Sequence, residues 1–318
     1  MRAIAIERFG GREQLKVMDV PEPLLGPDSV LVAVRAAGVN PVDAKIRQGA
    51  LAGAIPHLFP LVPGWDAAGT VAAVGPAVGG LEVGQDVYGY FRKDFVRDGT
   101  YAELAAVRDV QLAPKPATLS FEEAAALPLA GLTALQLLRE GIDLQRDETV
   151  LIHGASGGVG GFAVQLAHDA GAHVIAVASA ANHDHVRALG ADEVIDYRKQ
   201  DFVREVLAAH PDGIDGVVDV IGGETLARSA EVLITGRGRV ASVAEPPSAG
   251  AFATRGLATR YIFVRPDADG LRQLGDLADA GALRVPLAEV LALEQAADAH
   301  ELIETGHARG KLVLSMDS

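Results

Sequence analysis

The stretch TVLIHGASGGVGGFAVQLA, residues 149–167, decides the fold of this chain. A β-branched apolar run is followed by a glycine-rich turn and then by an apolar pattern with helical spacing. Ala155, Gly157 and Gly160 have the G-x-G-x-x-G spacing, with alanine in the first glycine position. Gly157 would let a pyrophosphate approach the backbone, and Gly160 would let the helix pack closely on the strand. We therefore predict a dinucleotide-binding loop, with a tight glycine turn without a ligand as the alternative. The expected contacts in this loop are Ala155, Ser156, Gly157, Gly158, Val159 and Gly160.

The alternation of β-branched runs and helical stretches seen at this loop continues from residue 120 to residue 265. Helical stretches alternate there with compact β-branched runs, which are TVLIHGA, HVIAVAS, EVIDY, GVVDVIGG and RVASVA. Five such runs with helices between them predict a doubly wound parallel sheet of the Rossmann type, because right-handed crossovers leave little topological freedom. We assign residues 120–265 to this domain.

The chain before residue 120 has a different pattern. Short β-like runs broken by Gly and Pro predict a mostly antiparallel β domain over residues 1–119. Residues 266–318 follow with a helix near 267–281, a strand-like VPLAEVLAL, a helix near 294–305 and a last strand KLVLSM. This segment could extend the parallel sheet or return to the first domain. The predicted fold class is thus α/β with two domains, since 318 residues exceed the usual size of one core.

The choice of dinucleotide depends on the end of the second strand of the parallel sheet. A carboxylate there would bind a ribose diol and repel a 2′-phosphate. The strand HVIAVAS ends instead at Ser179, and Asp184 comes only later. Ser179, Asn182, Tyr197 and Arg198 could surround a phosphate, so we expect NADPH rather than NADH. The alternative is that these polar residues only cap a helix and a turn.

Composition limits the partners of the chain. With 49% apolar residues, it has ample material for a large core. A formal net charge of −14 repels phosphate backbones and anionic membranes, so we expect neither nucleic acid nor membrane as a partner. The N-terminal MRAIAIERFGG lacks the apolar block of a signal peptide, and we expect a cytoplasmic protein. The longest uncharged run, residues 124–138, is too short to span a bilayer and predicts a buried helix.

The residues available for binding a metal ion are few. The chain contains no cysteine, which excludes disulfides and every zinc site built on cysteine. His183 and His185 would point to different faces of a helix. His57 could approach Asp66, although a lone loop histidine is more typical of a surface. The other histidines are scattered without ligand spacing, so we predict no bound metal.

Six stretches carry a resemblance to a known family over nearly the whole chain. They are GVNPVDAKIRQG (38–49), PLVPGWDAAGTVAAVG (60–75), AAALPLAGLTALQLL (124–138), HGASGGVGGFAVQLA (153–167), LGADEVIDY (189–197) and GHARGKLVL (306–314). The chain resembles the medium-chain dehydrogenase/reductase superfamily and, within it, the zinc-free quinone oxidoreductase branch. The resemblance implies a GroES-like β domain completed by residues 266–318, a Rossmann NADP-binding domain and a homodimer.

The resemblance also bears on zinc. Zinc-using members supply a Cys in the loop that corresponds to GVNPVD and a His followed by Glu in the stretch that corresponds to GWDAAG. This chain has Asn40 and Pro41 in that loop and Trp65 at the position of the His. An indole has only an N–H donor and cannot ligate a metal ion. We infer that Trp65 fills the space of a metal, either as a core aromatic or as a wall facing the substrate.

Without zinc, the chemistry must stabilise negative charge on an oxygen in another way. A quinone or an α,β-unsaturated carbonyl compound spreads that charge by conjugation, so we expect these substrates, reduced by hydride transfer in the cleft between the two domains. Two alternatives stay open: an enoyl reductase for lipid or polyketide thioesters, and a non-catalytic NADPH-binding redox sensor or structural protein.

The loop GVNPVDAKIRQG offers three candidate donors at the reacting centre. The resemblance places Asn40 beside the nicotinamide ribose, so we assign it to both cofactor binding and catalysis. Lys45 is a candidate acid or electrostatic helper, with a solvated surface pair with Asp43 as the alternative. The guanidinium of Arg47 is a third possible donor.

Three further positions are expected near the cofactor. The resemblance implies that Thr133 approaches the nicotinamide, whereas the residues alone suggest a buried helix hydroxyl bonded to its own backbone. Gly222 lies after the fourth parallel strand, where ligands collect in such sheets, although a helix-entry turn also explains it. We expect the strand-like segment 261–264, and Phe263 in it, to pass the nicotinamide. Tyr261 could reach the substrate or belong to the core.

Overall fold

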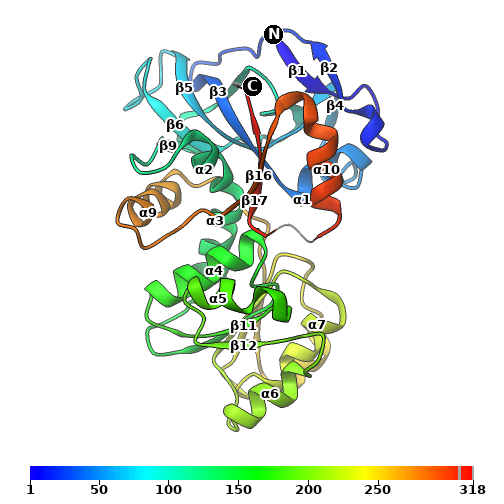
Figure 1. Cartoon of the computed structure of the whole chain (residues 1–318), viewed down its shortest axis with the longest axis vertical. Helices are drawn as coiled ribbons and strands as arrows, with labels where there is room; N and C mark the ends of the chain where they lie inside the picture. Colours follow the sequence, from blue (N-terminus) through cyan, green and yellow to red (C-terminus); the bar gives the residue numbers. More distant parts are fainter. Residues whose placement is uncertain (307–308, 317–318) are drawn as a thin grey trace. The chain divides into compact units, whose positions relative to one another are not determined.

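The chain folds into two units (Figure 1). This computed structural model describes residues 1–306 and 309–316, so His307 and Ala308 of the stretch GHARGKLVL lie outside the described residues. The first unit consists of Met1–Leu129, Pro266–Gly281 and the chain from Val285 onward, and the second consists of Ala130–Arg265 and Ala282–Arg284. The N-terminal segment of the first unit therefore runs to Leu129, beyond the boundary of residue 119 expected from the sequence.

The first unit is built on a seven-stranded sheet. The strand order is β16-β17-β3-β5-β6-β9, with β8 pairing β3 away from this path. All pairs are antiparallel except β16 with β17, which confirms the mostly antiparallel domain expected from the sequence. The bounds are β3 Ser29–Val39, β5 Asp66–Val74, β6 Asp86–Tyr90, β8 Leu104–Arg108, β9 Leu112–Pro114, β16 Leu287–Ala292 and β17 Lys311–Ser315.

Two small sheets and one helix complete the N-terminal part of this unit. The strand β1 (Arg2–Ala5) pairs with β2 (Lys16–Asp19), and β4 (His57–Val62) pairs with β7 (Val96–Asp98). Helix α1 (Pro41–Gln48) begins directly after β3, and Pro41 suits its first turn because a proline needs no intrahelical hydrogen bond there. The bend between β3 and α1 places Asn40 at the end of a buried strand.

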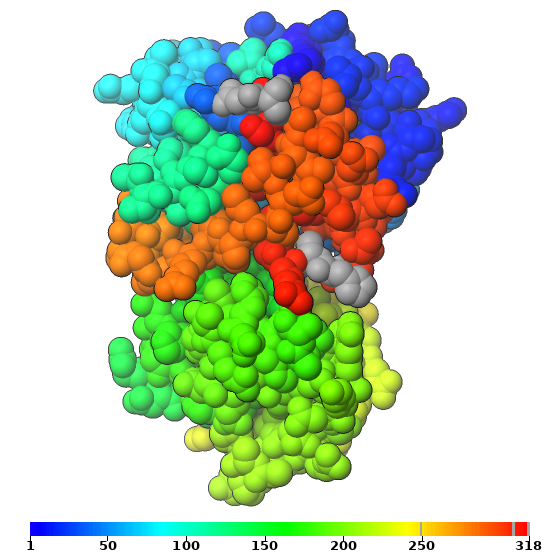
Figure 2. Space-filling view, viewed as in Figure 1, coloured from blue at the N-terminus to red at the C-terminus, as the bar shows by residue number. Residues whose placement is uncertain are grey.

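The C-terminal segment adds two separate helices and one pair of strands to the first unit. It contains α9 (Ala268–Asp279) and α10 (Ala296–Glu304). The strand β17 pairs antiparallel with β3, so residue 311 returns to the strand that precedes Asn40. Figure 2 shows the orange atoms of this segment lying against the teal atoms of the first unit.

The second unit contains a six-stranded sheet in which every pair is parallel. The strand order is β12-β11-β10-β13-β14-β15, which confirms the doubly wound Rossmann arrangement and puts its switch point between β10 and β13. The strands are β10 Thr149–Ile152, β11 His173–Val177, β12 Glu193–Ile195, β13 Gly216–Asp219, β14 Arg239–Ser242 and β15 Ala258–Tyr261. The helices are α4 Gly158–Asp169, α5 His183–Ala188, α6 Phe202–Ala209, α7 Gly223–Arg228 and α8 Ala249–Thr254.

The sixth strand differs from the sequence prediction. All four residues of β15 are exposed, so the edge strand ATRY has no apolar run by which to recognise it. The expected strand-like segment 261–264 is wrong in its bounds, because Tyr261 ends β15 and the next three residues are not in a strand.

The uncharged run 124–138 is divided between two α-helices and the start of a π-helix (Leu137–Gly141), instead of forming the single buried helix expected. Helix α2 (Phe121–Ala126) is capped by Ser120, whose Oγ accepts from the Glu123 N–H at 3.2 Å. Helix α3 (Pro128–Gln136) then begins at a proline, which lacks the N–H needed to continue α2. In the part of the chain that the structure describes, no helix combines the length and the apolar character needed to cross a membrane.

Candidate functional site

The glycine-rich loop after β10 has the geometry of a phosphate cradle. Gly154 has a φ of +65°, so the turn itself is made by Gly154 and not by Ala155 of the sequence motif. A Cβ on Gly154 would lie 2.6 Å from Val220 Cγ2, which shows how closely this loop packs on the segment after β13. A Cβ on Gly160 would collide with the Gly154 carbonyl oxygen, so the predicted close approach of helix and strand is present. Ala155 is buried, and its N–H donates to the Val177 carbonyl at 3.2 Å.

Gly157 differs from the other two glycines because its Cβ side is open. The nearest atom to a Cβ built there is the Gly154 carbonyl oxygen, at 3.4 Å. Gly157 is also the N-cap of α4, whose 12 residues begin at Gly158 and Val159. The first N–H groups of a helix have no intrahelical partner and lie at its positive dipole end. The loop therefore fits a pyrophosphate.

Two predicted residues complete the cradle from neighbouring elements. The Asn182 side chain, beyond the end of β11, donates from Nδ2 to Ser156 Oγ at 3.0 Å. Among the described residues, Asn182 Oδ1 is buried and has no hydrogen-bond partner. A buried oxygen without a partner costs about 1–3 kcal/mol, so this atom fits a donor from a bound ligand. Ser179 is 9% exposed and begins the turn that carries Asn182.

Exposed apolar side chains are spread along the carboxyl edge of the parallel sheet, the edge that carries the glycine-rich loop. Among the described residues of the second unit, the exposed large apolar side chains are those of Tyr197, Ile221, Tyr261 and Phe263. Each lies at or just beyond the carboxyl end of β12, β13 or β15, and parallel strands end along one edge. This edge therefore offers apolar surface for the flat rings of a dinucleotide. Tyr261 is 39% exposed, so of the two alternatives for this residue, membership of the core is wrong, and contact with the substrate stays a prediction.

The remaining predicted residues of the second unit are found in three settings. Arg198 Nε lies 3.4 Å from the Tyr197 hydroxyl, which leaves an exposed cation after β12. Gly222 has a φ of +80°, and its N–H donates a hydrogen bond of 3.0 Å to Oδ2 of the buried Asp219. Asp219 was missed in the sequence, where it looks like one more residue of a strand. Thr133 is buried in α3, and its contact with a cofactor stays a prediction.

A buried polar cluster lies in the first unit around Asn40. Asn40 Nδ2 donates to Asp66 Oδ2 at 2.8 Å, and Asn40 Oδ1 accepts from the Lys311 ammonium. Lys311 Nζ also donates to the Val39 carbonyl at 3.1 Å, and Asp66 Oδ1 accepts from the Leu129 N–H at 2.9 Å. Asn40 is 1% exposed, Asp66 0% and Lys311 5%. The amide of Asn40 is therefore held from both ends by residues far away in the sequence.

Asp43 and Tyr101 extend this cluster. Asp43 Oδ2 accepts from the Asn40 N–H at 2.8 Å and from the Tyr101 hydroxyl at 3.1 Å. Asp43 is fully buried, whereas Lys45 lies exposed on the other side of α1. The expected surface pair of these two residues is wrong, because positions i and i+2 of a helix face apart. The role of Lys45 as an acid stays a prediction. We call Asn40, Asp43, Asp66, Tyr101 and Lys311 the Asn40 cluster.

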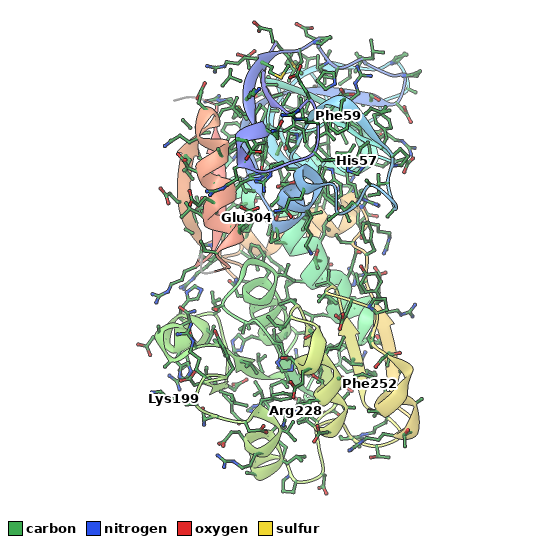
Figure 3. All side chains as sticks on the ribbon, turned by 90° about the vertical axis from the view of Figure 1, so that its right-hand side faces the viewer. His57, Phe59, Lys199, Arg228, Phe252 and Glu304 are labelled. Atoms are coloured by element: carbon green, nitrogen blue, oxygen red, sulfur yellow. The ribbon has the colours of Figure 1, made fainter. Side chains whose placement is uncertain are left out.

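Arg47 is not available as a donor to a substrate. It is 1% exposed, and its NH1 lies 3.0 Å from His300 Nδ1. Its NH2 donates to Glu304 Oε1 at 2.5 Å, at the C-terminal end of α10 (Figure 3). The guanidinium therefore ties α1 to α10, and the interpretation of Arg47 as a free donor at the reacting centre is wrong.

Burial moves the pKa values of the two carboxyl groups and of the lysine in the Asn40 cluster toward neutrality. It raises the pKa of the Asp43 carboxyl to about 7, despite the N–H of Asn40 that donates to it. It raises the pKa of Asp66 to about 6, although the Lys311 ammonium opposes this shift. Burial also lowers the pKa of Lys311, against the pull of the two carboxylates. The carboxyl groups of Asp43 and Asp66 are thus both stabilised by the single ammonium group of Lys311, in a place shielded from water.

This electrostatic arrangement predicts that the first unit loses stability as pH rises. Because Asp43 and Asp66 have raised pKa values in the folded state, the fold binds more protons than the unfolded chain between about pH 4 and pH 7. The stabilisation is complete below the unfolded pKa of 3.8 and is lost as pH rises through 6 and 7. The buried His300, whose pKa burial lowers from 6.5 to about 3, acts in the opposite direction below pH 6.5, but the two carboxyl groups together outweigh it. We therefore expect urea unfolding, followed by the fluorescence of the single tryptophan Trp65, to show a lower free energy of unfolding at pH 8 than at pH 5.

The variant Asp43→Asn isolates the contribution of one carboxyl group. Each unit of pKa shift corresponds to about 1.4 kcal/mol, so we expect a clearly flatter pH profile for this variant. Asp94→Asn, at an exposed position, should keep the profile of the parent protein. Equal slopes for Asp43→Asn and the parent would show that Asp43 does not take up a proton in this range.

The residues near Trp65 do not fit a zinc ion. Trp65 is 4% exposed and packs edge-on against Tyr90, with ring centroids 6.0 Å apart, as expected of a core aromatic. The next residue, Asp66, accepts a hydrogen bond from the Asn40 side chain, and the Lys311 ammonium donates one to the oxygen of the same side-chain amide. An indole supplies no lone pair, and a bound ammonium repels a second cation.

Two sequence interpretations of histidines need correction. His57 does not approach Asp66, because its Nδ1 lies 2.7 Å from the Ile55 carbonyl oxygen and its ring packs against Phe9. Phe9 also contacts Phe59, and His57 and Phe59 lie in the same part of the first unit in Figure 3. The remaining histidines are not all scattered, because His173 and His210 meet at Glu193.

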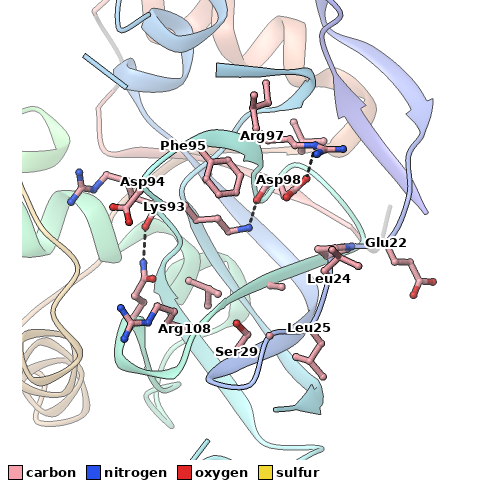
Figure 4. A pocket seen from close by; sticks show the side chains of 18 of the residues that line it. Glu22, Leu24, Leu25, Ser29, Lys93, Asp94, Phe95, Arg97, Asp98 and Arg108 are labelled. Carbon is pink, nitrogen blue, oxygen red and sulfur yellow. Dashed lines mark hydrogen bonds and ion pairs between the residues drawn. The ribbon is translucent and has the colours of Figure 1, made fainter. Parts of the chain in front are cut away.

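A pocket of about 1110 Å³ lies in the first unit (Figure 4). Its wall includes exposed apolar side chains such as Leu24 and Phe95, together with Lys93, whose ammonium donates to the Asp98 carbonyl at 3.0 Å. None of the site residues predicted from the sequence lines this pocket. This pocket is therefore not the site predicted from the sequence.

Comparison with known proteins agrees with this geometry. The family described as alcohol dehydrogenase GroES-like domain matches residues 26–117, and that described as zinc-binding dehydrogenase matches residues 189–314. The chloroplast envelope quinone oxidoreductase homolog of Arabidopsis thaliana is 33% identical over 99% of this chain and 98% of its own length. The NADPH-dependent alkenal/one oxidoreductase of the same plant is 36% identical over 99% of this chain and 79% of its own length. The crystal structure of Escherichia coli quinone oxidoreductase complexed with NADPH aligns with a TM-score of 0.87 at 28% identity, over 99% of this chain and 100% of that chain.

Proposed function

This chain belongs to the medium-chain dehydrogenase/reductase superfamily, among its quinone oxidoreductases, and from that premise we propose that it is an NADPH-dependent reductase of quinones or α,β-unsaturated carbonyl compounds. The observation that carries the proposal is the loop at Gly157, which is open on its Cβ side and precedes the N-terminus of a 12-residue helix. It lies at the switch point of a parallel sheet, where dinucleotides bind.

The residues of this chain that would hold the cofactor come from four places. The N–H groups of Gly158 and Val159 would bind the pyrophosphate, and Asn182 Oδ1 would accept from a ribose hydroxyl. Ser179 and Arg198 favour a 2′-phosphate, because no carboxylate follows β11 directly. When bound, NADPH supplies the hydride. We also propose that Asn40, fixed by Asp66 and Lys311, donates its second amide hydrogen to the nicotinamide ribose.

The substrate class follows from how charge would be stabilised. We propose that the reduction needs no zinc, because the residues at Trp65 and Asn40 do not fit that ion. A conjugated acceptor then has the advantage, since it spreads the negative charge over several atoms. Reduction of a quinone also requires a proton, and Lys45 on the exposed side of α1 is our candidate donor. We further propose a cytoplasmic homodimer.

Steady-state turnover tests this function. NADPH consumption should be measured with 9,10-phenanthrenequinone, an enone and an enoyl thioester as acceptors. We expect turnover with the quinone or the enone. Saturable NADPH binding without turnover of any acceptor would contradict the proposal and favour a non-catalytic sensor. Turnover of the thioester alone would instead indicate an enoyl reductase.

The end of β11 gives a specific prediction for the cofactor. Ser179→Asp puts a carboxylate where a 2′-phosphate would bind, so the ratio of kcat/KM for NADPH to that for NADH should fall at least about tenfold, or ~1.4 kcal/mol. Ser179→Ala is the matched control, because it removes the hydroxyl without adding charge and should lower the ratio far less. An unchanged ratio for Ser179→Asp would place the 2′-phosphate elsewhere.

A further inference from the structure

Two histidines and one glutamate meet at the edge of the parallel sheet opposite the glycine-rich loop. His173 is the first residue of β11, Glu193 is the first residue of β12, and His210 follows the C-terminal end of α6. The carboxyl ends of the same strands carry Ser179 and Tyr197, so this group lies at the amino edge. We propose that His173, Glu193 and His210 bind one divalent transition metal ion, of which Zn²⁺ fits best.

The three side chains already converge on one point. Glu193 Oε1 lies 2.7 Å from His173 Nε2 and 3.0 Å from His210 Nε2. One ligand atom from each residue lies within 4.8 Å of the others, and the two imidazole centroids are 5.7 Å apart. Zinc–ligand distances near 2.1 Å put tetrahedral ligands about 3.4 Å apart, so small side-chain rotations suffice.

The chemistry of this group matches zinc more closely than calcium or magnesium. Two imidazoles and one carboxylate are a ligand set that zinc uses, with the fourth position left to water. Calcium and magnesium prefer oxygen ligands throughout. The three side chains are between 23% and 40% exposed, so an ion can enter from solvent.

A second carboxylate, that of Asp192, lies beside the proposed ligand His173 and would orient its ring. Asp192 Oδ2 lies 3.7 Å from His173 Nδ1 and is fixed by the Val174 N–H, which donates to it at 2.8 Å. Metal-bound histidines commonly have a carboxylate near the other ring nitrogen, where it orients the ring. Two acids at this point, in a chain with a net charge of −14, also favour a cation over an anion.

The competing interpretation is a purely structural cross-link. In this interpretation, each imidazole does no more than donate an N–H hydrogen bond to Glu193, and the two bonds tie the end of α6 to the sheet. This arrangement needs a proton on each Nε2, whereas a metal ion would replace both protons. Metal titration separates the two interpretations. None of the three ligands belongs to the residues proposed to bind NADPH. The result of the metal titration therefore does not affect the proposed reductase function.

The test uses the full chain after dialysis against a chelator. Co²⁺ is titrated and followed by visible absorption, and Zn²⁺ is titrated by calorimetry. We expect one equivalent of each metal to bind, with the intense visible bands of four-coordinate Co²⁺, and Zn²⁺ to displace the Co²⁺. His210→Ala should weaken Zn²⁺ binding at least about tenfold, or ~1.4 kcal/mol, while NADPH turnover stays unchanged. His168→Ala, on the exposed side of α4, is the matched control and should bind like the parent.

Two results would overturn the proposal. One is Co²⁺ binding to the parent protein without four-coordinate bands. The other is equal Zn²⁺ affinity of the parent and of His210→Ala. If His210→Ala does not fold, Glu193→Gln tests the same ligand set with a nearly identical shape, and the Co²⁺ spectrum of the parent needs no variant.

Discussion

Replacing Lys311 with methionine should destabilise the first unit by about 3–5 kcal/mol, the usual cost of leaving a buried charge without its partner. Methionine keeps the length of the side chain but removes the ammonium that bonds Asn40 Oδ1 and the Val39 carbonyl. The fully buried Asp66 carboxylate then loses the positive charge that lowers its pKa. Urea unfolding followed by Trp65 fluorescence measures the loss, because the only tryptophan lies in the first unit.

A double variant distinguishes this electrostatic account from a simple packing defect. Asp66→Asn removes the orphaned charge, so Lys311→Met combined with Asp66→Asn should recover part of the lost stability. Lys16→Met, at an exposed position of β2, is the matched control and should change the free energy of unfolding by less than about 0.5 kcal/mol. No recovery in the double variant would show that Lys311 does not act by balancing Asp66.

Replacing Gly157 with alanine should weaken NADPH binding on the order of 100-fold, or ~2.7 kcal/mol, while the fold is kept. The residue has a φ of −81°, and a methyl group would meet its nearest atom only at 3.4 Å, so the free protein accommodates alanine. The same methyl group would occupy the approach of the pyrophosphate. NADPH fluorescence titration gives the affinity, and urea unfolding followed by far-ultraviolet circular dichroism checks that the helices and sheet of the second unit are intact.

Gly79→Ala is the control for this substitution. Gly79 is exposed and has no atom within 4 Å of a built Cβ, so this alanine should alter neither NADPH affinity nor stability. If Gly157→Ala bound NADPH as tightly as the parent, the loop would not be where the pyrophosphate binds.

The sequence predicts much of the second unit because its signals are local. The β-branched run, the glycine turn and the helix occur within residues 149–167, and the order of the parallel strands follows from their connections. The edge strand β15 has no such signal, since its four residues are exposed. The role of Gly154 in the turn could not be predicted from the motif either, because only the structure shows which glycine of the loop has a positive φ.

The Asn40 cluster could be predicted only in part, since it depends on contacts between distant positions. Asn40 and Lys311 are 271 residues apart, and no spacing rule connects them. Two signals were present nonetheless: an aspartate among the small residues of GWDAAG, and a lysine that opens the apolar strand KLVLS. A charged residue inside a buried run indicates a buried partner. His173, Glu193 and His210 are likewise brought together only by the sheet register.

The central claim is that reduction by NADPH proceeds without a metal ion at the reacting centre. The most direct measurement is turnover of 9,10-phenanthrenequinone by His210→Ala protein, before and after dialysis against a chelator, with the zinc content of each sample determined. This variant weakens the proposed peripheral site by removing one of its three ligands, so zinc that survives dialysis against a chelator would be held elsewhere. We predict a negligible zinc content and the same turnover before and after chelation. One retained zinc ion per chain, with turnover lost on chelation and restored by added zinc, would contradict the claim.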